Sequence, residues 1–171
     1  MKKFSISLII AVLCHLPIEA QDIFQVARDN SVADLEKIWT EEIHVDQTDK
    51  RGFTPLILAV YNESYEAAKF LLDKGANPDV QDSNGNTALM GATFKAYPKM
   101  VDLLLEYKAD VNLSNFNNAP ALIFAATFGQ TDIAKKLLEK GANKSIKDNS
   151  GKTALDHAKI QENQEMIKLL Q

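Results

Sequence analysis

The chain has 171 residues and a mass of 19.0 kDa; 46% of the residues are apolar and 25% are charged. These fractions are typical of a globular domain, and seven glycines, five prolines and one cysteine are too few for a disordered, collagen-like or disulfide-scaffold chain. Because the net charge is −4, binding to nucleic acid or to an anionic membrane surface is not expected.

The first twenty residues have the pattern of a secretory signal peptide. Lys2 and Lys3 give a basic start, residues 4–16 are mostly apolar, and a small residue, Ala20, precedes the expected cleavage point. The apolar run is shorter than the roughly 20 residues that a membrane-spanning helix needs. An amphipathic helix is disfavoured, because residues 8–14 are apolar on every face. We therefore predict a signal peptide over residues 1–20.

Cys14 is the only cysteine and lies inside this segment. A bacterial lipid-attachment cysteine follows a small residue, whereas Leu13 precedes Cys14, so we interpret the cysteine as part of the apolar signal core. Cleavage after Ala20 leaves 151 residues without a thiol and, since Lys2, Lys3 and Glu19 are lost, a net charge of −5. The short basic start indicates bacterial export, so we expect a periplasmic protein; an extracellular one is less expected.

The remainder of the chain repeats itself every 33 residues, which is typical of a repeat protein. Thr54, Thr87 and Thr153 occupy one column, with Pro120 as its odd member. Three more columns hold a single residue type in four copies: Leu56, Leu89, Leu122 and Leu155; Ala59, Ala92, Ala125 and Ala158; Leu71, Leu104, Leu137 and Leu170.

Each copy predicts two short helices. Thr54 can cap the first helix with its hydroxyl, and Pro55 suits the first helical position. After a break at residues 62–64, apolar residues over 67–72 predict a second helix, which Gly75 can end in a left-handed conformation. Such a unit buries its leucine face only against a neighbouring copy, so the copies are expected to stack.

These motifs resemble the ankyrin repeat. The family signature corresponds here to Gly52-Phe53-Thr54-Pro55-Leu56 and Leu71-Leu72-Asp73-Lys74-Gly75-Ala76. The resemblance implies an all-α solenoid of helix-turn-helix units with short β-turn fingers. The departures from the family pattern affect only the expected turn geometry: Ala88 and Ala121 for proline, Asn118 for the turn glycine and Lys108 for the loop glycine.

We expect one repeat domain over residues 21–171, divided into five copies. The first copy is degenerate: it keeps apolar residues in the equivalent columns but lacks Thr-Pro-Leu, and it is expected to cap the stack. The last copy becomes polar and is expected to cap the other end. The expected bounds are 21–48 for the N-terminal cap, 49–81, 82–114 and 115–147 for the internal copies, and 148–171 for the C-terminal cap.

Residues that carry chemistry are sparse after residue 20. His44 and His157 are about three copies apart, so no zinc ligand set is expected. Residues 82–86 begin like a calcium-binding loop, but Thr87 and Thr93 stand where that loop needs glycine and a bidentate glutamate. We therefore interpret the aspartate as a turn residue. No nucleophile, phosphate-loop or dinucleotide motif is present, and we expect no enzyme activity, metal or cofactor.

The columns that vary between copies are the candidate binding positions. The resemblance places them on the turn fingers and along the exposed side of the first helices, which together line a concave groove. Five aromatics fall in these columns, where hot-spot residues are common, and basic residues are interleaved with them. The alternative is that some aromatics lie between copies and extend the core. The candidate partner-binding residues are Lys50, Arg51, Phe53, Tyr61, Phe94, Lys95, Phe116 and Phe128.

These observations favour a monomeric, non-enzymatic protein-interaction module in the periplasm that binds one or more proteins through its groove, with no nucleic acid partner and no membrane insertion after signal cleavage. The resemblance to exported bacterial ankyrin proteins implies two alternatives: an immunity protein that blocks a toxin, or an accessory protein that supports a periplasmic catalase under oxidative stress. A small hydrolase or metal-handling enzyme that uses the fingertip carboxylates, and a structural spacer, are alternatives of other classes.

Overall fold

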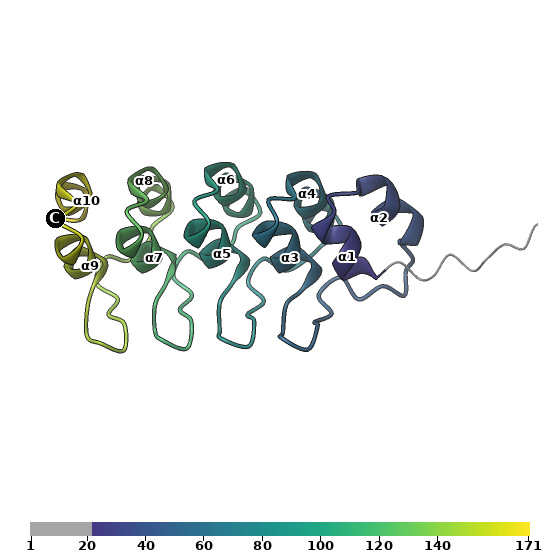
Figure 1. The fold of residues 1–171 in the computed structure, drawn as a ribbon, viewed down its shortest axis with the longest axis horizontal. Helices are drawn as coiled ribbons and strands as arrows, with labels where there is room; N and C mark the ends of the chain where they lie inside the picture. Colours follow the sequence, from purple (N-terminus) through teal and green to yellow (C-terminus); the bar gives the residue numbers. More distant parts are fainter. Residues whose placement is uncertain (1–21) are drawn as a thin grey trace, which may run out of the picture.

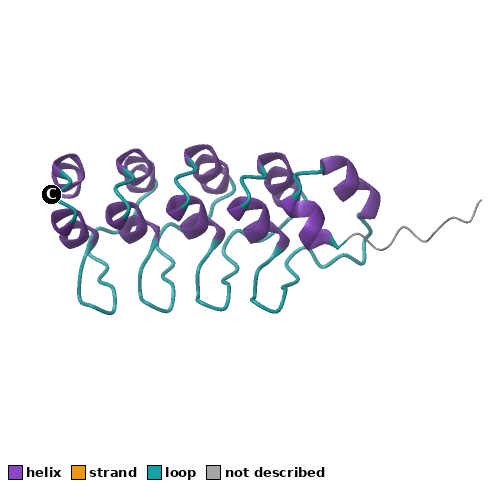
Figure 2. Cartoon of the chain, viewed as in Figure 1, coloured by secondary structure: helices purple, strands orange, loops and turns teal. Residues whose placement is uncertain are grey.

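The computed structural model describes residues 22–171 as a row of five antiparallel helix pairs (Figures 1 and 2). Within that range there is no strand, only an isolated bridge between Ser114 and Pro120. This confirms the predicted all-α fold. The predicted signal peptide, with Cys14, lies outside the described residues.

The first helix of each pair belongs to an inner row and the second to an outer row. Long loops, here called fingers, join one pair to the next and project from the inner row away from the outer row (Figure 1). The inner helices are α1 (Ile23–Arg28), α3 (Pro55–Tyr61), α5 (Ala88–Phe94), α7 (Ala121–Thr127) and α9 (Ala154–Ile160). The outer helices are α2 (Val32–Ile38), α4 (Tyr65–Asp73), α6 (Pro98–Glu106), α8 (Thr131–Glu139) and α10 (Gln164–Leu170).

The threonine column caps the inner helices as predicted. The Thr54 hydroxyl accepts a hydrogen bond from the N–H of Ile57 at 3.1 Å, and Thr87 caps α5 in the same way. Thr153 forms a full capping box with Asp156. Pro120 precedes α7 without a side-chain cap, because it has no group that can accept these hydrogen bonds.

The repeated leucines and alanines form one continuous core. Leu71, Leu104 and Leu137 of the outer row are completely buried, and so is the alanine column of the inner row. Small side chains in that column let adjacent inner helices approach closely. Leu155 is only half-buried, because α9 is the last inner helix of the described stack.

The turns keep a left-handed backbone even where glycine is replaced. Lys108 has φ +63° where Gly75 and Gly141 have +89° and +87°, and Asn118 has φ +56° in the turn-glycine column. The departures from the family pattern thus leave the turn geometry intact. A third left-handed column, which the sequence did not reveal, lies between the two helices of each pair: Asn30, Glu63, Ala96, Gly129 and Glu162.

A ladder of side-chain acceptors fixes each finger to the next. The side-chain oxygen of Asp46 accepts the N–H of Asn77 at 2.9 Å, Asp79 accepts that of Asp110 at 2.9 Å, and Asn112 accepts that of Asn143 at 2.8 Å. Because every link joins adjacent repeats, the fingers form a regular row of fixed spacing. None of the helices over residues 22–171 has the length and apolar character needed to cross a bilayer.

Candidate protein-binding face

The fingers and the C-terminal ends of the inner helices form one face of the stack, here called the finger face. In the second repeat the rings of Phe53, just before α3, and Tyr61, at its end, lie 5.7 Å apart. The residue before the cap and the residue at the helix end therefore face the same side. The repeat geometry extends this arrangement along the row.

Phe94 and Phe128 form the centre of this face. Phe94 ends α5 and Phe128 is the C-cap of α7, so adjacent repeats present them side by side. Their ring centroids are 5.0 Å apart at 84°, an edge-to-face contact that aromatic pairs favour. Even so, 46% of Phe94 and 47% of Phe128 are exposed to solvent.

Phe116 lies at a fingertip and is 69% exposed. Its N–H donates to the carbonyl of Asn84 in the preceding finger at 3.1 Å, and its ring lies against Gly85. A Cβ at position 85 would approach the Phe116 ring to 2.7 Å, so only glycine allows this contact. The backbone therefore holds Phe116 in place although its ring meets solvent.

Phe53 and Tyr61 were expected to be exposed, but both side chains are only partly exposed. Tyr61 lies across Gly91 of the next repeat, where a Cβ would be 3.3 Å from its ring. The alternative interpretation, that some aromatics lie between copies, therefore applies to Tyr61. Burial, together with the nearby Asp82 carboxylate, raises the pKa of the Tyr61 hydroxyl.

Ile160 extends the face by one repeat. It ends α9, lies in the same column as Phe94 and is 58% exposed. Ile160 was not among the aromatic and basic candidates, although an isoleucine in that column was a usable signal. Here the apolar strip means the four large apolar residues exposed in the described chain: Phe94, Phe116, Phe128 and Ile160.

The three candidate basic residues border the aromatics. The Arg51 guanidinium lies 4.5 Å from the centre of the Phe53 ring and 3.6 Å from the Asp49 carboxylate. Lys50 and Lys95 are exposed and form no ion pair with any residue of the described range. The finger face therefore presents apolar rings with cationic groups beside them.

The turn aspartates bind backbone, as the sequence analysis expected. Hydrogen bonds from the N–H groups of Lys152 and Ser150, and the His157 ring 2.7 Å away, hold the pKa of Asp148 below its ordinary value. His44 is exposed in its loop. Among residues 22–171, no three His, Cys, Asp or Glu side chains are grouped so that they could hold a metal ion.

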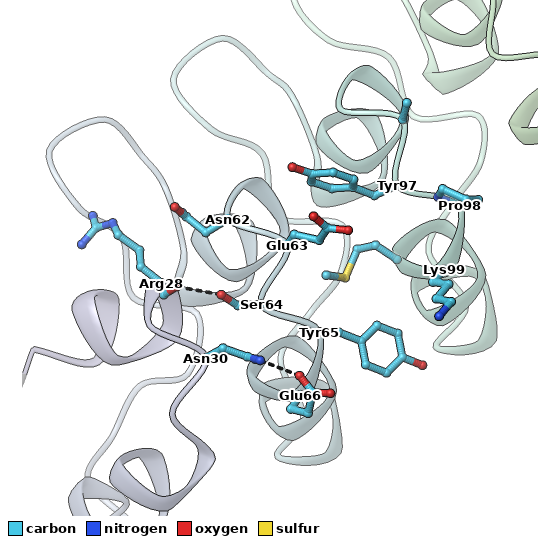
Figure 3. Close-up of a pocket in the computed structure, with 12 residues that line it drawn as sticks. Arg28, Asn30, Asn62, Glu63, Ser64, Tyr65, Glu66, Tyr97, Pro98 and Lys99 are labelled. Atoms are coloured by element: carbon cyan, nitrogen blue, oxygen red, sulfur yellow. Dashed lines mark hydrogen bonds between the residues drawn. The ribbon is translucent and has the colours of Figure 1, made fainter.

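A groove that the sequence did not predict lies along the helix-turn-helix corners of the first three repeats (Figure 3). It is an open groove of about 980 Å³. Its polar groups largely bind one another: the Ser64 hydroxyl donates to the carbonyl of Arg28 at 2.7 Å, and Asn30 bridges to Glu66 and to the N–H of Ala67. The candidate binding residues do not line it.

Comparison with known proteins agrees with this architecture. Residues 23–115 match the family described as "Ankyrin repeats (3 copies)", and residues 104–158 match "Ankyrin repeats (many copies)". The chain therefore belongs to the ankyrin repeat family, whose members generally bind proteins.

Similar curated proteins share only a few repeats with the chain. The palmitoyltransferase akr1 of Neurospora crassa is 42% identical over 66 residues, which cover 37% of this chain and 9% of that protein. The akr1 protein of Emericella nidulans is 40% identical over 58 residues, or 33% and 8% of the two chains. The E3 ubiquitin-protein ligase hecd-1 of Caenorhabditis elegans is 53% identical over 36 residues, or 21% and 1%. Because the chain spans less than a tenth of these relatives, their named activities are not transferred to it.

Proposed function

We propose that this chain is a non-enzymatic protein-interaction module of the periplasm, which binds a protein partner through the finger face. One observation carries the proposal: the four large exposed apolar residues of the described chain all lie in the variable columns of that face. These four residues lie outside the leucine and alanine columns that build the core, so the fold does not require apolar side chains at their positions. Exposed apolar residues grouped on one surface are typical of an interaction site.

The geometry of the face suits tight binding. Phe94 and Phe128 hold each other edge to face, and the backbone contact with Asn84 fixes Phe116. Rings held in this way lose little conformational entropy when a partner covers them. A standard interface buries about 800 Å² on each partner. A row of fingers and helix ends over several repeats can supply a surface of that size.

Crosslinking in living cells tests the partner site. A photoreactive amino acid at position 94 is expected to capture a protein, and replacing both Phe128 and Ile160 with alanine in that variant is expected to abolish the capture. The control is the pair Tyr97→Ala and Tyr107→Ala, which removes two half-buried rings away from the apolar strip. If both pairs reduce capture equally while circular dichroism shows intact helices, the proposed site is wrong.

The location is tested separately. The pattern of residues 1–20 supports export, and the mature protein is expected to begin at Gln21. Mass spectrometry of the periplasmic fraction is expected to find a chain shortened by those residues. Full-length protein in the cytoplasmic fraction would contradict the periplasmic assignment and leave the binding face unaffected.

A further inference from the structure

The charges of the finger face differ from those of the rest of the chain. The contact columns are defined as Lys50, Arg51, Phe53, Tyr61 and Asn62 with their equivalents 33, 66 and 99 residues further on. These twenty positions hold four cations and no carboxylate, although 23 of the 171 residues are acidic. Since the whole chain has a net charge of −4, all other residues together carry −8.

The finger aspartates nearest these columns are already engaged, whereas Glu63 and Glu162, which follow the helix-end columns, are exposed. Asp49 accepts the N–H groups of Arg51 and Phe53 at 2.8 and 3.0 Å, and Asp82 makes the equivalent pair of hydrogen bonds in the next finger. Asp82 is also 4% exposed, and Asp148 is paired with His157. These acids hold the turns together, whereas the four cations extend from the same fingers and helix ends.

The cations alternate with the aromatics in the same columns. Lys50 occupies the column of Phe116, and Lys152 occupies the column of Phe53. Lys95 follows Phe94 directly, beside the Phe94–Phe128 pair. A partner that covers the apolar strip therefore brings its flanking groups next to these cations. Only Arg51 among them forms an ion pair within the described chain, with Asp49 at 3.6 Å.

We infer that the partner surface is an acidic protein segment in which apolar anchor residues are flanked by aspartate or glutamate. This inference rests on the proposed function and specifies its partner. The apolar anchors cover Phe94 and Phe128, and the flanking carboxylates meet Lys50, Arg51 and Lys95. Complementary charges at the rim of an interface increase the association rate and exclude wrong partners. The negative charge elsewhere on the chain repels the same acidic segment and so orients its approach.

A single-stranded nucleic acid could also stack on aromatic rings between cations. The four cations are spread over four repeats in a chain of net charge −4, which disfavours a continuous phosphate path. The protein partner is therefore the favoured occupant, and oligonucleotide binding is one of the outcomes that the experiment measures.

The test uses a phage-displayed library of random peptides, selected on the purified repeat protein at low salt. Three variants are compared for each selected peptide. The first combines Phe94→Ala and Phe128→Ala; the second combines Lys50→Glu, Arg51→Glu and Lys95→Glu. The third is a control that reverses three exposed lysines outside the contact columns, Lys140, Lys144 and Lys168, to glutamate.

The expected peptides carry Asp or Glu on both sides of apolar residues. Their affinity is expected to fall about tenfold or more in the contact-column reversal and to weaken as salt rises, with little change in the control reversal. Neutral or basic peptides that need Phe94 and Phe128 but ignore the reversal would overturn the inference and leave the proposed function standing.

Two other results overturn both. If no selected peptide depends on Phe94 and Phe128, the apolar strip is not the binding site. If a fluorescent oligothymidylate binds more tightly than every selected peptide and loses binding in the same reversal, the face is a nucleic-acid site and the acidic-segment assignment is wrong.

Discussion

The inner and outer rows of helices contain the same number of elements, yet they meet solvent in different ways. In α5 of the inner row, residues 88–93 are all buried and Phe94 is the first exposed residue. In α6 of the outer row, buried Met100, Val101 and Leu104 occupy one side, while Lys99 and Glu106 are exposed. The inner helices α3 and α5 are thus buried along their length, and only their last residues reach solvent.

The two surfaces also differ in how their charges are satisfied. On the outer row, Lys136 of α8 binds Asp102 of α6 at 2.7 Å, and Lys135 reaches Glu165 of α10 at 2.9 Å. The outer surface pairs its own charges from repeat to repeat, whereas Lys50 and Lys95 of the finger face form no ion pair within the described residues. This contrast supports the proposal that the outer row stabilises the stack and the finger face binds a partner.

The largest expected effect is on the inner row. Replacing Leu89 of α5, which is 1% exposed, with alanine is expected to lower the free energy of unfolding by about 3 kcal/mol, through lost burial and a cavity between repeats. Urea denaturation measures this change. The control is Leu138→Ala in α8, a half-buried outer position, which should cost clearly less. Equal losses would show that the burial of the leucine does not determine the cost of removing it.

The second prediction concerns the finger aspartates. Asp82→Ala removes the acceptor for the N–H groups of Asn84 and Asn86 and is expected to cost about 2 kcal/mol. Asp82→Asn keeps an acceptor oxygen at the same place and should recover much of that loss. If the two variants unfold at the same urea concentration, hydrogen bonding is not what the aspartate contributes.

The pH dependence of stability follows from the equivalent residue in the last finger. The N–H of Lys152 and the His157 ring keep the pKa of Asp148 below 3.8 in the folded chain. A lowered pKa means that Asp148 stabilises the fold fully above its unfolded pKa and loses this contribution as the pH falls through the folded value. Denaturation at a series of pH values below about 4 should therefore show a smaller pH dependence for Asp148→Asn.

The repeat fold was predictable because its signals are local and repeated. The Thr54 cap, the alanine column and the Gly75 turn each follow from residue type and spacing. The exposure of Phe94, Phe116 and Phe128 followed from their columns in the same way. Tyr61 did not, because its burial depends on Gly91, a residue of the next repeat whose missing side chain makes room for the ring.

The acceptor ladder and the left-handed column between paired helices were also missed. Asp46, Asp79 and Asn112 vary in type, so no single residue marks their column; only the geometry shows that each accepts the same kind of N–H. Glu63 and Ala96 gave no signal of a left-handed backbone, since neither is a residue type that favours it. Contacts between repeats can thus hold conformations that the local sequence does not indicate.

A smaller, stabilising effect on the free energy of unfolding is expected at Lys108, which stands where other copies have the loop glycine. Lys108→Gly relieves a left-handed lysine at φ +63° and is expected to stabilise the fold by about 0.5–1 kcal/mol. The control is Lys140→Gly, whose φ of −93° suits any residue, so glycine there should only destabilise. Thermal or urea denaturation distinguishes the two. A loss of stability in both would show that the lysine backbone carries no strain.

The smallest effect is expected from the outer ion pairs. Lys136 and Asp102 join adjacent repeats, but both side chains are partly exposed, and the entropy of holding them offsets most of their attraction. Asp102→Asn is therefore expected to shift the urea midpoint only slightly, and the shift should disappear in high salt because the charges are screened. Reversing the finger-face cations should likewise leave stability almost unchanged while it weakens partner binding. If Asp102→Asn instead destabilises the chain as much as Leu89→Ala, the outer row is more than a solvated surface, and the division of roles between the two rows is wrong.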